Sequence, residues 1–597
     1  MRAILLFGKH LNKYYLKYSP ILLLGLLALV MVDYFQLIVP KLYKTVVNGL
    51  NDGTVTLADG TVRAFDMAFL LDEVCRPMIF VILIMVFGRF LWRICFFGTA
   101  LKVETDLRSR MFDRCKDLSV SFYQVNKVGD LMAKFINDLQ TVQDCFGSGI
   151  LMFFDALLLG VLSVWKMWNM NHMLTFLSLI PMILLFAVGT VVGKNMRRKW
   201  ETRQEAFSAL SDFSQESFSG ISVIKAFVRE AAELSAFRKL NTENEDANVE
   251  YTKASTFLNI FVTLFVESVI CVILGYGGSL VHDKIFNAGE LIEFIGYFTA
   301  VVWPIMAISQ LIEMASRGKA SLGRISALLD EVSEVTDKDG AKDIDNIRGD
   351  IEYRHLTFLY PGADFDALDD VCLNIKAGEN IGIIGATGSG KTTLVDLLLR
   401  TYNVPDGTLF IDGNDVNGLK IKDVRAAIAY VPQDNFLFSD TIENNIAFAD
   451  NRANHSAVEE AAIISDVHDN ITEFSESYKT VLGERGVTVS GGQKQRISIA
   501  RAIIKDAPIL ILDDSVSAVD TNTEKKILDN LRRTRKGKTT LLIAHRVTAV
   551  EQMDKVVFIN DGKIAAVGTH DELYNTNKAY HTMVELQRLD EEKEDKQ

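Results

Sequence analysis

The sequence predicts an α-helical membrane domain with six spans, followed by an α/β domain. Long apolar runs crowd the first half of the 597 residues, whereas the second half has the mixed pattern of a soluble domain. A glycine-rich loop between an apolar strand and an amphipathic helix marks that second half as α/β. A chain of this length suggests several domains. We expect a membrane-surface helix at 1–19, a transmembrane domain at 20–325, a linker at 326–348, the α/β domain at 349–588 and a charged tail at 589–597.

Six apolar stretches are long enough to cross a bilayer, which takes about 20 mostly apolar residues. The third and fourth are joined by a very short turn around Asn169 to His172. The start of the chain, MRAILLFGKHLNKYYLKYSP, mixes apolar and basic residues and predicts an amphipathic helix on the inner membrane surface. We place the spans near 20–43, 77–101, 147–169, 173–195, 257–281 and 291–315.

Basic residues in the connecting loops orient these spans in a plasma membrane. Two long loops are rich in lysine and arginine, whereas the loop after the fifth span carries only Lys284. By the positive-inside rule the long loops, and with them both chain ends, are cytoplasmic. Helical spacing within these loops predicts that the spans continue into the cytoplasm and touch another domain at their tips. The basic residues are Lys102, Arg108, Arg110, Arg114, Lys116, Lys127 and Lys134 in the first loop, and Lys194, Arg197, Arg198, Lys199 and Arg203 in the second.

Acidic residues interrupt the predicted spans, and the first outer loop is longer than a tight turn. An ionised group at membrane depth is costly and usually faces a wet cavity or a partner. Two interpretations of these acids remain open: they line a polar path that attracts cations, or they form hydrogen bonds between helices. The outer loop LNDGTVTLADGTVRAFDMAFLLDEV predicts a small hairpin or helical extension. The four acids are Asp33, Asp155, Glu267 and Glu293.

Charge and cysteine content exclude some functions. The formal net charge of −13 argues against a nucleic-acid partner. The six cysteines show no paired spacing and no CxxC, so we expect neither a disulfide nor a zinc framework.

The stretch IGIIGATGSGKTTLVDLLLR predicts a phosphate-binding loop of the G-x-x-x-x-G-K-[ST] type between a strand and a helix. Its glycines let the backbone wrap phosphates, which the helix N-terminus faces. Lys391 should reach the β- and γ-phosphates of ATP, and the Thr392 hydroxyl should bind Mg²⁺. The α/β domain is therefore a P-loop nucleotide-binding domain. Its expected loop contacts are Gly385, Thr387, Gly388, Ser389, Gly390, Lys391, Thr392 and Thr393.

Further nucleotide contacts follow in order along the chain. Tyr360 in TFLYPG offers a platform for the adenine ring. Gln433 follows a strand as a contact for Mg²⁺ and water, and His545 ends another strand as a sensor of the γ-phosphate. In VSGGQKQRISIARAI a helix begins at a second phosphate site. Because the domain already has one phosphate loop, we expect this second site, formed by Ser490, Gly491, Gly492 and Gln493, to serve a nucleotide held by another subunit.

The chain resembles an ATP-binding cassette (ABC) exporter half-transporter of the six-span type, with the type IV ABC fold. GATGSGKT matches the Walker A motif of that family, Gln433 the Q-loop, VSGGQ the signature, and His545 the H-loop. GERG around Glu484 matches the X-loop, and SAVD ending at Asp520 the D-loop. The resemblance implies two such halves with two ATPs, each held between Walker A of one half and the signature of the other.

The Walker B motif departs from the family pattern of four apolar residues, Asp and then Glu. Asp513 follows Ile509 to Leu512 and keeps the Mg²⁺-linked role, but Asp514 replaces the Glu that polarises the attacking water. Aspartate is one methylene shorter, and a misplacement of about 1 Å can cost on the order of 10²-fold in rate. The resemblance then implies the degenerate half of a heterodimeric exporter. Its intact signature would complete a competent site on a partner that carries the Glu.

These observations predict ATP-driven export of amphipathic drugs or lipids, with weak hydrolysis at this chain's own site. A homodimer with two slow sites and a channel-like ABC protein gated by ATP binding are the alternatives. The short linker leaves little room for a regulatory segment, and the fusion of membrane and nucleotide domains disfavours an importer. Neither the cargo nor the partner follows from the residues.

Overall fold

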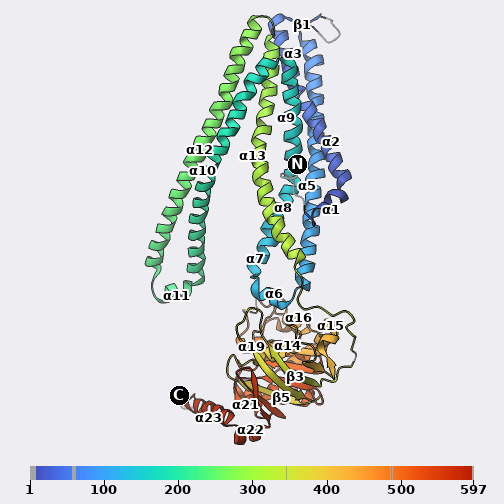
Figure 1. The fold of residues 1–597 in the computed structure, drawn as a ribbon, viewed down its shortest axis with the longest axis vertical. Coiled ribbons are helices and arrows are strands. Elements are labelled where there is room, and N and C mark those ends of the chain that lie inside the picture. Colours follow the sequence, from blue (N-terminus) through green and yellow to red (C-terminus); the bar gives the residue numbers. More distant parts are fainter. Residues whose placement is uncertain (1–7, 57–61, 345, 484–485, 487, 595–597) are drawn as a thin grey trace. The chain divides into compact units, whose positions relative to one another are not determined.

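The computed structural model describes residues 8–56, 62–344, 346–483, 486 and 488–594, without the side chains of 182–194, 309 and 590–594. The chain divides into two compact units (Figure 1). One unit joins Met1–Cys115 to Gly129–Asp330, and the other joins Lys116–Val128 to Glu331–Gln597. The domain limits expected from the sequence remain a prediction.

The first unit is almost entirely helical. Its elements are α1 (Asn12–Lys17), α2 (Ser19–Gln36), α3 (Val39–Asp52), β1 (Thr54–Thr56), β2 (Val62–Ala64), α4 (Met67–Phe69), the π-helix η1 (Leu70–Cys75), α5 (Arg76–Asp117, whose last two residues fall in the second unit), α7 (Val128–Ala133, whose first residue falls in the second unit), the π-helix η2 (Lys134–Asp138), α8 (Leu139–Asp144), the π-helix η3 (Cys145–Gly149), α9 (Ile150–Met170), α10 (His172–Ser219), α11 (Ile221–Ala226), α12 (Glu230–His282) and α13 (Ala288–Asp330).

Five helical stretches in the described part are long and apolar enough to cross a membrane. The predicted fourth span falls in α10, where the described apolar part, His172–Pro181, runs into residues whose side chains are not described. The first predicted span lies within the stretch Ser19–Asp52, which is interrupted because α2 ends at Gln36 and α3 begins at Val39. Pro40 at the start of α3 has no N–H to donate to the preceding turn, which explains the interruption. The five stretches are Ser19–Asp52, Met67–Asp117, Val128–Met170, Glu230–His282 and Ala288–Asp330.

The predicted connections between the spans are present. In the first outer loop, β1 and β2 pair antiparallel as a hairpin, with Thr54 opposite Ala64. The turn between α9 and α10 is a single residue, Asn171, whose side chain accepts a hydrogen bond from Leu174 N at 2.8 Å and caps α10. At the start of the chain, α1 is short, and residues 1–7 of the predicted surface helix lie outside the described part.

Two of the four acids in the predicted spans bind other helices. Asp155 on α9 accepts a hydrogen bond from Trp303 Nε1 on α13 at 2.9 Å. Glu293 on α13 pairs with Lys44 on α3 at 3.2 Å. Asp33 is buried, whereas Glu267 is exposed. Bonding between helices therefore accounts for Asp155 and Glu293 without a transport path.

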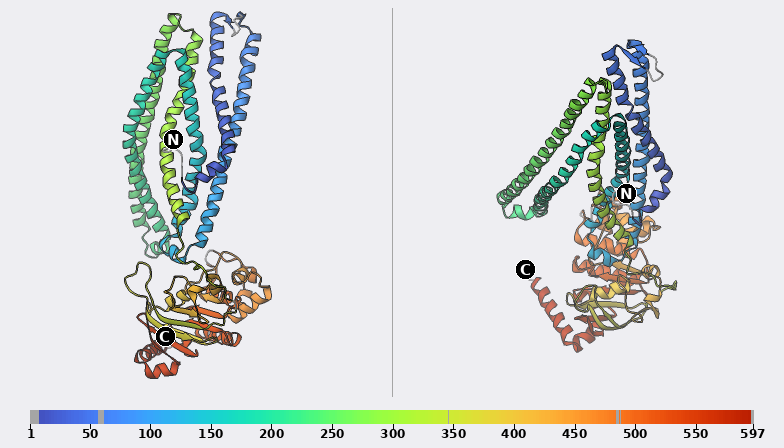
Figure 2. Two further views of the ribbon diagram at one scale, coloured as in Figure 1. Left: turned by 45° about the vertical axis from the view of Figure 1, so that its right-hand side comes forward. Right: turned by 45° about the horizontal axis from the view of Figure 1, so that its top comes forward.

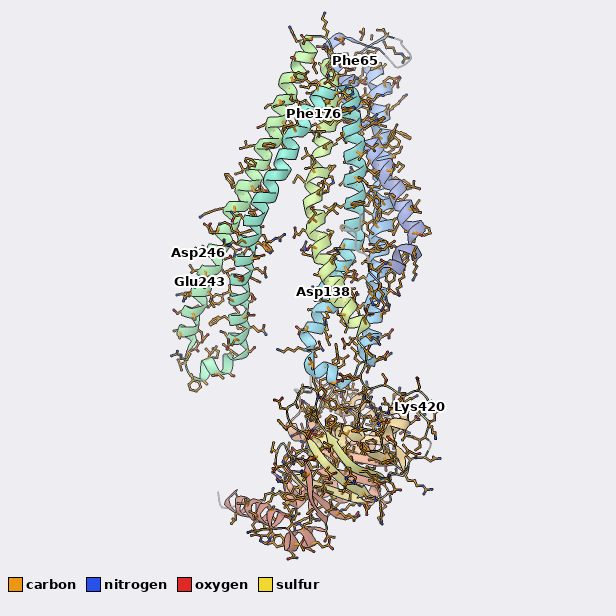
Figure 3. All side chains as sticks on the ribbon, in the orientation of Figure 1. Phe65, Asp138, Phe176, Glu243, Asp246 and Lys420 are labelled. Atoms are coloured by element: carbon orange, nitrogen blue, oxygen red, sulfur yellow. The ribbon has the colours of Figure 1, made fainter. Side chains whose placement is uncertain are left out.

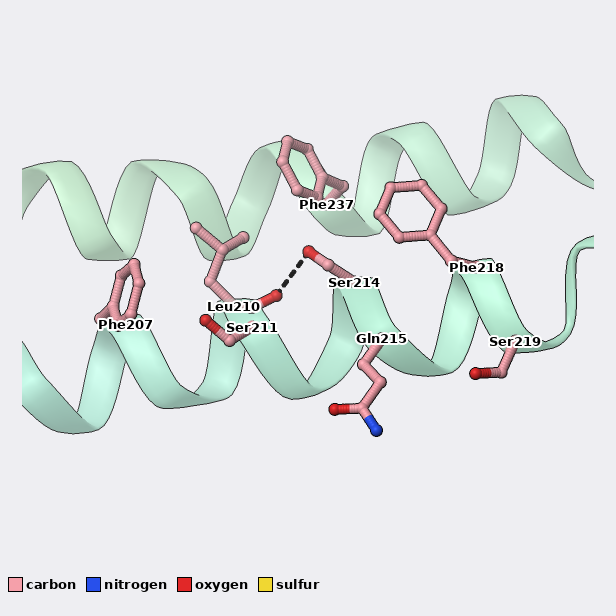
Figure 4. A pocket seen from close by; sticks show the side chains of 8 residues that line it. All are labelled: Phe207, Leu210, Ser211, Ser214, Gln215, Phe218, Ser219 and Phe237. Carbon is pink, nitrogen blue, oxygen red and sulfur yellow. Dashed lines mark hydrogen bonds between the residues drawn. The ribbon is translucent and has the colours of Figure 1, made fainter. Parts of the chain in front are cut away.

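Helices α10 and α12 run side by side as a long hairpin closed by α11 (Figures 1 and 2). Near the tip, large apolar side chains are exposed, among them Phe218, Phe227 and Val228 at 73–80%. A shallow groove between the two helices is lined by Phe207, Leu210, Phe218 and Phe237 around Ser214, whose hydroxyl donates to Leu210 O at 2.7 Å (Figure 4). The hairpin thus presents apolar surface that this chain leaves uncovered in the described part.

The second unit is built on two sheets. A six-stranded sheet has the order β12-β11-β5-β10-β9-β8, parallel except for β12, and an antiparallel sheet has the order β4-β3-β6-β7. The strands are β3 (Ile351–Phe358), β4 (Leu368–Ile375), β5 (Asn380–Gly385), β6 (Leu409–Ile411), β7 (Asn414–Asp415), β8 (Ile428–Val431), β9 (Ile509–Asp513), β10 (Thr539–Ile543), β11 (Lys555–Asn560) and β12 (Lys563–Gly568).

Helices cover these sheets and extend to the end of the described chain. They are α14 (Lys391–Leu398), the 3-10 helix η4 (Val416–Gly418), α15 (Ile421–Ala426), α16 (Ile442–Ala447), α17 (His455–Ile464), α18 (His468–Thr472), the 3-10 helix η5 (Ser477–Lys479), α19 (Gly491–Ile503), α20 (Thr521–Thr534), α21 (Val547–Val550), α22 (His570–Thr576) and α23 (Lys578–Glu594).

The tip of the first long loop belongs to this second unit, as α6 (Val120–Val125). Tyr402 donates a hydrogen bond from its hydroxyl to the Gln124 side chain, and Ser121 Oγ donates to Glu334 at 3.0 Å. The expectation that this tip touches another domain is therefore confirmed, while the same expectation for α11 remains a prediction.

Candidate nucleotide site

The parallel strands bring the predicted nucleotide residues to one edge of the sheet. Strands β5, β10, β9 and β8 are parallel and lie consecutively in the sheet, so their carboxyl ends lie along one edge. The phosphate loop follows β5, Gln433 lies two residues beyond β8, Asp513 ends β9, and His545 lies two residues beyond β10. The crevice outside the carboxyl ends of such strands is where α/β proteins bind ligands.

Two glycines of the loop occupy positions that no other residue fits. A Cβ on Gly385 would lie 2.1 Å from Ile559 O. Gly390 has φ +97°, and a Cβ there would lie 2.5 Å from Ala367 O. Because the backbone must pass this close to β11 and to the start of β4, the glycine spacing reflects packing as well as phosphate binding.

Lys391 is buried and turns back onto its own loop. Its Nζ donates to Gly385 O at 2.9 Å and to Ala386 O at 2.8 Å. Burial lowers the pKa of Lys391, although Asp513 and Asp514 oppose this shift. A phosphate brought to the loop would restore full charge compensation to this ammonium.

Asp513 and Thr392 provide the oxygen donors that Mg²⁺ prefers. Thr392 Oγ1 donates to Asp513 Oδ1 at 3.3 Å, and Asp513 is 1% exposed. Its second oxygen, Oδ2, is buried without a hydrogen-bond partner among the described residues. Burial also raises the pKa of Asp513, although the hydrogen bond from Thr392 and the charge of Lys391 oppose this shift. An orphaned carboxylate oxygen beside a threonine hydroxyl fits a metal ion, and Gln433 is exposed on the adjoining loop.

Asp514 is held by its backbone in an unusual conformation. Its φ is +45°, a left-handed value that aspartate tolerates better than most residues. Its N–H donates to Ile543 O at 2.9 Å, and its carbonyl accepts from Ser517 Oγ at 2.9 Å and Gln495 Nε2 at 3.4 Å. These three hydrogen bonds hold the backbone of Asp514 and oppose a main-chain shift that would carry its short carboxylate forward.

Tyr360 stands over the first turn of α14, next to the phosphate loop. Its hydroxyl hydrogen-bonds to Thr393 Oγ1 at 2.9 Å, and its ring contacts Phe358 and Tyr402 edge-on at centroid distances of 5.0 and 5.2 Å. These contacts orient the ring of Tyr360 from the side and hold it beside the loop.

The signature segment starts α19 through a capping box. Ser490 Oγ accepts from Gln493 N at 3.2 Å, and Gln493 Oε1 accepts from Ser490 N at 3.0 Å. Gly491 is exposed, and a Cβ there would meet nothing within 4 Å. The D-loop residue Asp520 caps α20 by accepting from Asn522 N and Thr523 N at 3.1 and 3.0 Å, which lowers its pKa. The first turn of α19 is thus preformed and open to a ligand.

The structure places two further residues beside the candidate nucleotide site that the sequence analysis did not identify. Gln495 binds the carbonyl of Asp514 and, through Oε1, accepts from Ala518 N at 3.0 Å, which links Walker B to the D-loop. Asp396 in α14 has a pKa raised to about 6 by burial and by the charge of Asp513. Neither residue belongs to a recognisable motif. Glu484 lies outside the described residues, as does its neighbour in the X-loop.

Both domains match known families. Residues 22–305 match the ABC transporter transmembrane region, and residues 368–517 match the ABC transporter ATP-binding domain. A helical membrane unit and a P-loop unit with this site define an ABC transporter. The chain belongs to the ABC transporter family.

Similar proteins include several ABC transporters from bacteria. The chain is 34% identical over 590 residues, 98% of its length and 97% of the relative, to the probable multidrug resistance ABC transporter ATP-binding/permease protein YheI of Bacillus subtilis. It is 33% identical over 95% of its length to the multidrug resistance-like ATP-binding protein MdlA of Escherichia coli, which is covered to 94%. The fold resembles that of a bacterial Atm1-family ABC exporter with ATP bound, with a TM-score of 0.76, 24% identity and coverage of 96% and 98%.

Proposed function

We propose that the chain is one half of a heterodimeric exporter that uses ATP to move amphipathic drugs or lipids across the plasma membrane. Relatives named as a probable multidrug resistance ABC transporter and as an ATP-dependent lipid A-core flippase support the cargo class. The chain would lie in the membrane as a multi-pass protein with both termini in the cytoplasm, as the basic loops indicate.

One observation supports assigning different roles in ATP hydrolysis to the two halves. Asp514 stands where the family has a water-polarising glutamate, and its backbone is hydrogen-bonded at three points. The shorter carboxylate therefore does not reach the position of the attacking water, and the backbone hydrogen bonds oppose its movement toward that position. Catalysis of phosphoryl transfer depends mainly on positioning and electrostatics, so ATP binds here and is hydrolysed slowly.

The remaining nucleotide contacts support normal binding. Lys391 is buried beside a preformed loop, Thr392 and Asp513 offer a Mg²⁺ site, and Tyr360 is oriented beside the loop. Mg²⁺ would neutralise phosphate charge when bound with ATP. The signature at Gly491 is open and serves the competent site of a partner that carries the glutamate. The exposed apolar tip of the α10–α12 hairpin, at Phe218 and Phe227, also favours a second half-transporter that covers it.

The test compares ATPase rates of the purified chain alone and of the chain co-purified with a second half-transporter. We expect the lone chain to hydrolyse ATP far more slowly than the pair. Equal rates per nucleotide-binding domain would refute the heterodimer and favour the homodimer with two slow sites. A pair whose partner lacks the Walker B glutamate would serve as the control for the competent site.

A further inference from the structure

A cluster of metal-binding side chains lies on the antiparallel sheet of the second unit, within the β3–β4 pair. His355 comes from β3, and Asp370 and Cys372 come from β4. Their ligand atoms all lie within 4.8 Å of one another, and all three residues are exposed. The site is separate in sequence from the phosphate loop and uses none of the nucleotide residues.

The strand pattern explains why these three side chains meet. Along β4, exposed and buried residues alternate, so Asp370 and Cys372 point to the same outer face. Along β3 the alternation breaks, because Arg354 and His355 are both exposed where the register to β4 shifts. This bulge places the imidazole of His355 opposite Cys372 on the outer face. His355 and Asp370 also have positive φ values, 47° and 52°, which is uncommon for residues other than glycine.

The distances suit a small ion. His355 Nδ1 lies 2.7 Å from Asp370 Oδ1 and 3.5 Å from Cys372 Sγ. Ligands about 2.0–2.3 Å from a tetrahedral zinc ion stand roughly 3.5 Å apart, so modest side-chain rotations would complete the geometry. The backbone N–H of His355 donates to Cys372 Sγ at 3.3 Å.

The nearby basic residues are paired mainly outside the cluster. The Nζ of Lys563 pairs with Asp369 at 2.9 Å, and the charge of Asp370 acts on it more weakly. Arg354 pairs with Glu352 and lies over the ring of Phe410. The ion pair between His355 and Asp370 is itself largely exposed, at 78% and 65% for the two side chains, and such a pair contributes little to stability.

We propose that His355, Asp370 and Cys372 form a surface site for a divalent ion of the Zn²⁺ class, with one coordination position open to solvent. Imidazole, carboxylate and thiolate together select a borderline ion over Mg²⁺. The bound ion would tie β3 to β4 at His355, three residues before β3 ends at Phe358, and the chain then leads to Tyr360. Because the donors come from a bulge and an adjacent strand, no paired-cysteine spacing reveals the site in the sequence.

The experiment uses the full-length chain in detergent, with any histidine tag removed and excess Mg²⁺-ATP present. Co²⁺ serves as the spectroscopic probe, because only a thiolate ligand gives a sulfur-to-cobalt charge-transfer band. Zn²⁺ affinity is then measured by competition with a chromophoric chelator. We expect one equivalent of Co²⁺ per chain with that band. Zn²⁺ should raise the thermal unfolding midpoint of the nucleotide-binding unit.

Variants decide whether the three residues hold the ion. Cys372→Ser should abolish the band, and His355→Gln and Asp370→Asn should each weaken Zn²⁺ binding about tenfold or more. Cys271→Ser is the matched control, because Cys271 is also an exposed cysteine but lies on α12. No thiolate band in the parent chain, a band that survives Cys372→Ser, or unchanged Zn²⁺ affinity in His355→Gln would each overturn the proposal. Nucleotide binding by the variants checks that they are folded.

Discussion

At the scale of single residues, the proposed function makes Asp514 the determinant of how fast this chain hydrolyses its own ATP. Its side chain lacks one methylene, while its backbone is held by β10, by Ser517 and by Gln495. Asp514→Glu restores the missing reach without disturbing these backbone bonds. We expect hydrolysis at this site to rise, by up to about 10²-fold, where the partner's signature completes it. Single-turnover ATPase in a pair whose partner site is inactivated measures the change, and a rate unchanged from Asp514 would contradict the argument.

A second residue-scale prediction separates the two ATP sites. Gly491→Asp would bring a carboxylate against the γ-phosphate of the partner's ATP and should remove most ATPase activity of the assembled pair. A Cβ added at Gly491 would meet nothing within 4 Å among the described residues, so local crowding at that atom would not explain the loss. Gly491→Ala is the neutral control, and steady-state ATPase of the pair is the measurement.

The same assay applied to Asp514→Asn should show only a modest change, since little of the turnover occurs at this site. Strong loss from Asp514→Asn together with mild loss from Gly491→Asp would reverse the assignment of the competent and degenerate sites.

At the scale of elements, a charged contact fixes η2 to α13 within the helical unit. Asp138 accepts hydrogen bonds from Arg324 Nε and Ser321 Oγ, each at 2.8 Å, and its side chain is 9% exposed (Figure 3). Asp138→Asn keeps the shape but removes the charge. Because Arg324 is half-exposed, we expect a loss of about 1 kcal/mol, seen as a lower thermal unfolding midpoint in detergent.

Glu313 offers the matched control for that change. It pairs with Arg317 on the same helix at 3.5 Å, but both side chains are more than two-thirds exposed. Glu313→Gln should therefore leave the midpoint unchanged. Equal effects of Asp138→Asn and Glu313→Gln would show that burial of the Asp138 contact contributes nothing.

The elements also show what sequence can predict. Apolar runs, the short turn at Asn171 and the glycine spacing around Lys391 are local patterns, and local patterns were sufficient for the spans, the α9–α10 turn and the strand–loop–helix. The left-handed Asp514 and the bulge at His355 depend on strands and helices distant in sequence. Such contacts leave no periodic signal. The interruption before Pro40 was not predicted, although proline disfavours a continuous helix, because the residues around it form one apolar run.

At the scale of the whole molecule, the proposal separates ATP binding from ATP hydrolysis within one chain. In this proposal, Tyr360, Lys391 and Thr392 supply stacking, charge and metal contacts, so the affinity for nucleotide should be normal. Asp514 would remove only the positioning of water. ATP bound here should persist through many cycles of the competent site and keep the two nucleotide-binding domains partly engaged. Opening of the inner gate would then follow turnover at the competent site alone.

This persistence can be measured by trapping nucleotide during turnover of the assembled pair and identifying what occupies the site at Lys391. We expect mostly Mg²⁺-ATP there, while the partner's site holds mostly ADP. In Asp514→Glu the nucleotide at Lys391 should shift toward ADP, because the restored methylene permits hydrolysis. ADP at Lys391 in the parent chain, or a site without nucleotide, would show that this half turns over or releases its ligand in every cycle. Lys391→Ala, which removes the ammonium from the phosphate loop, controls for nucleotide trapped elsewhere.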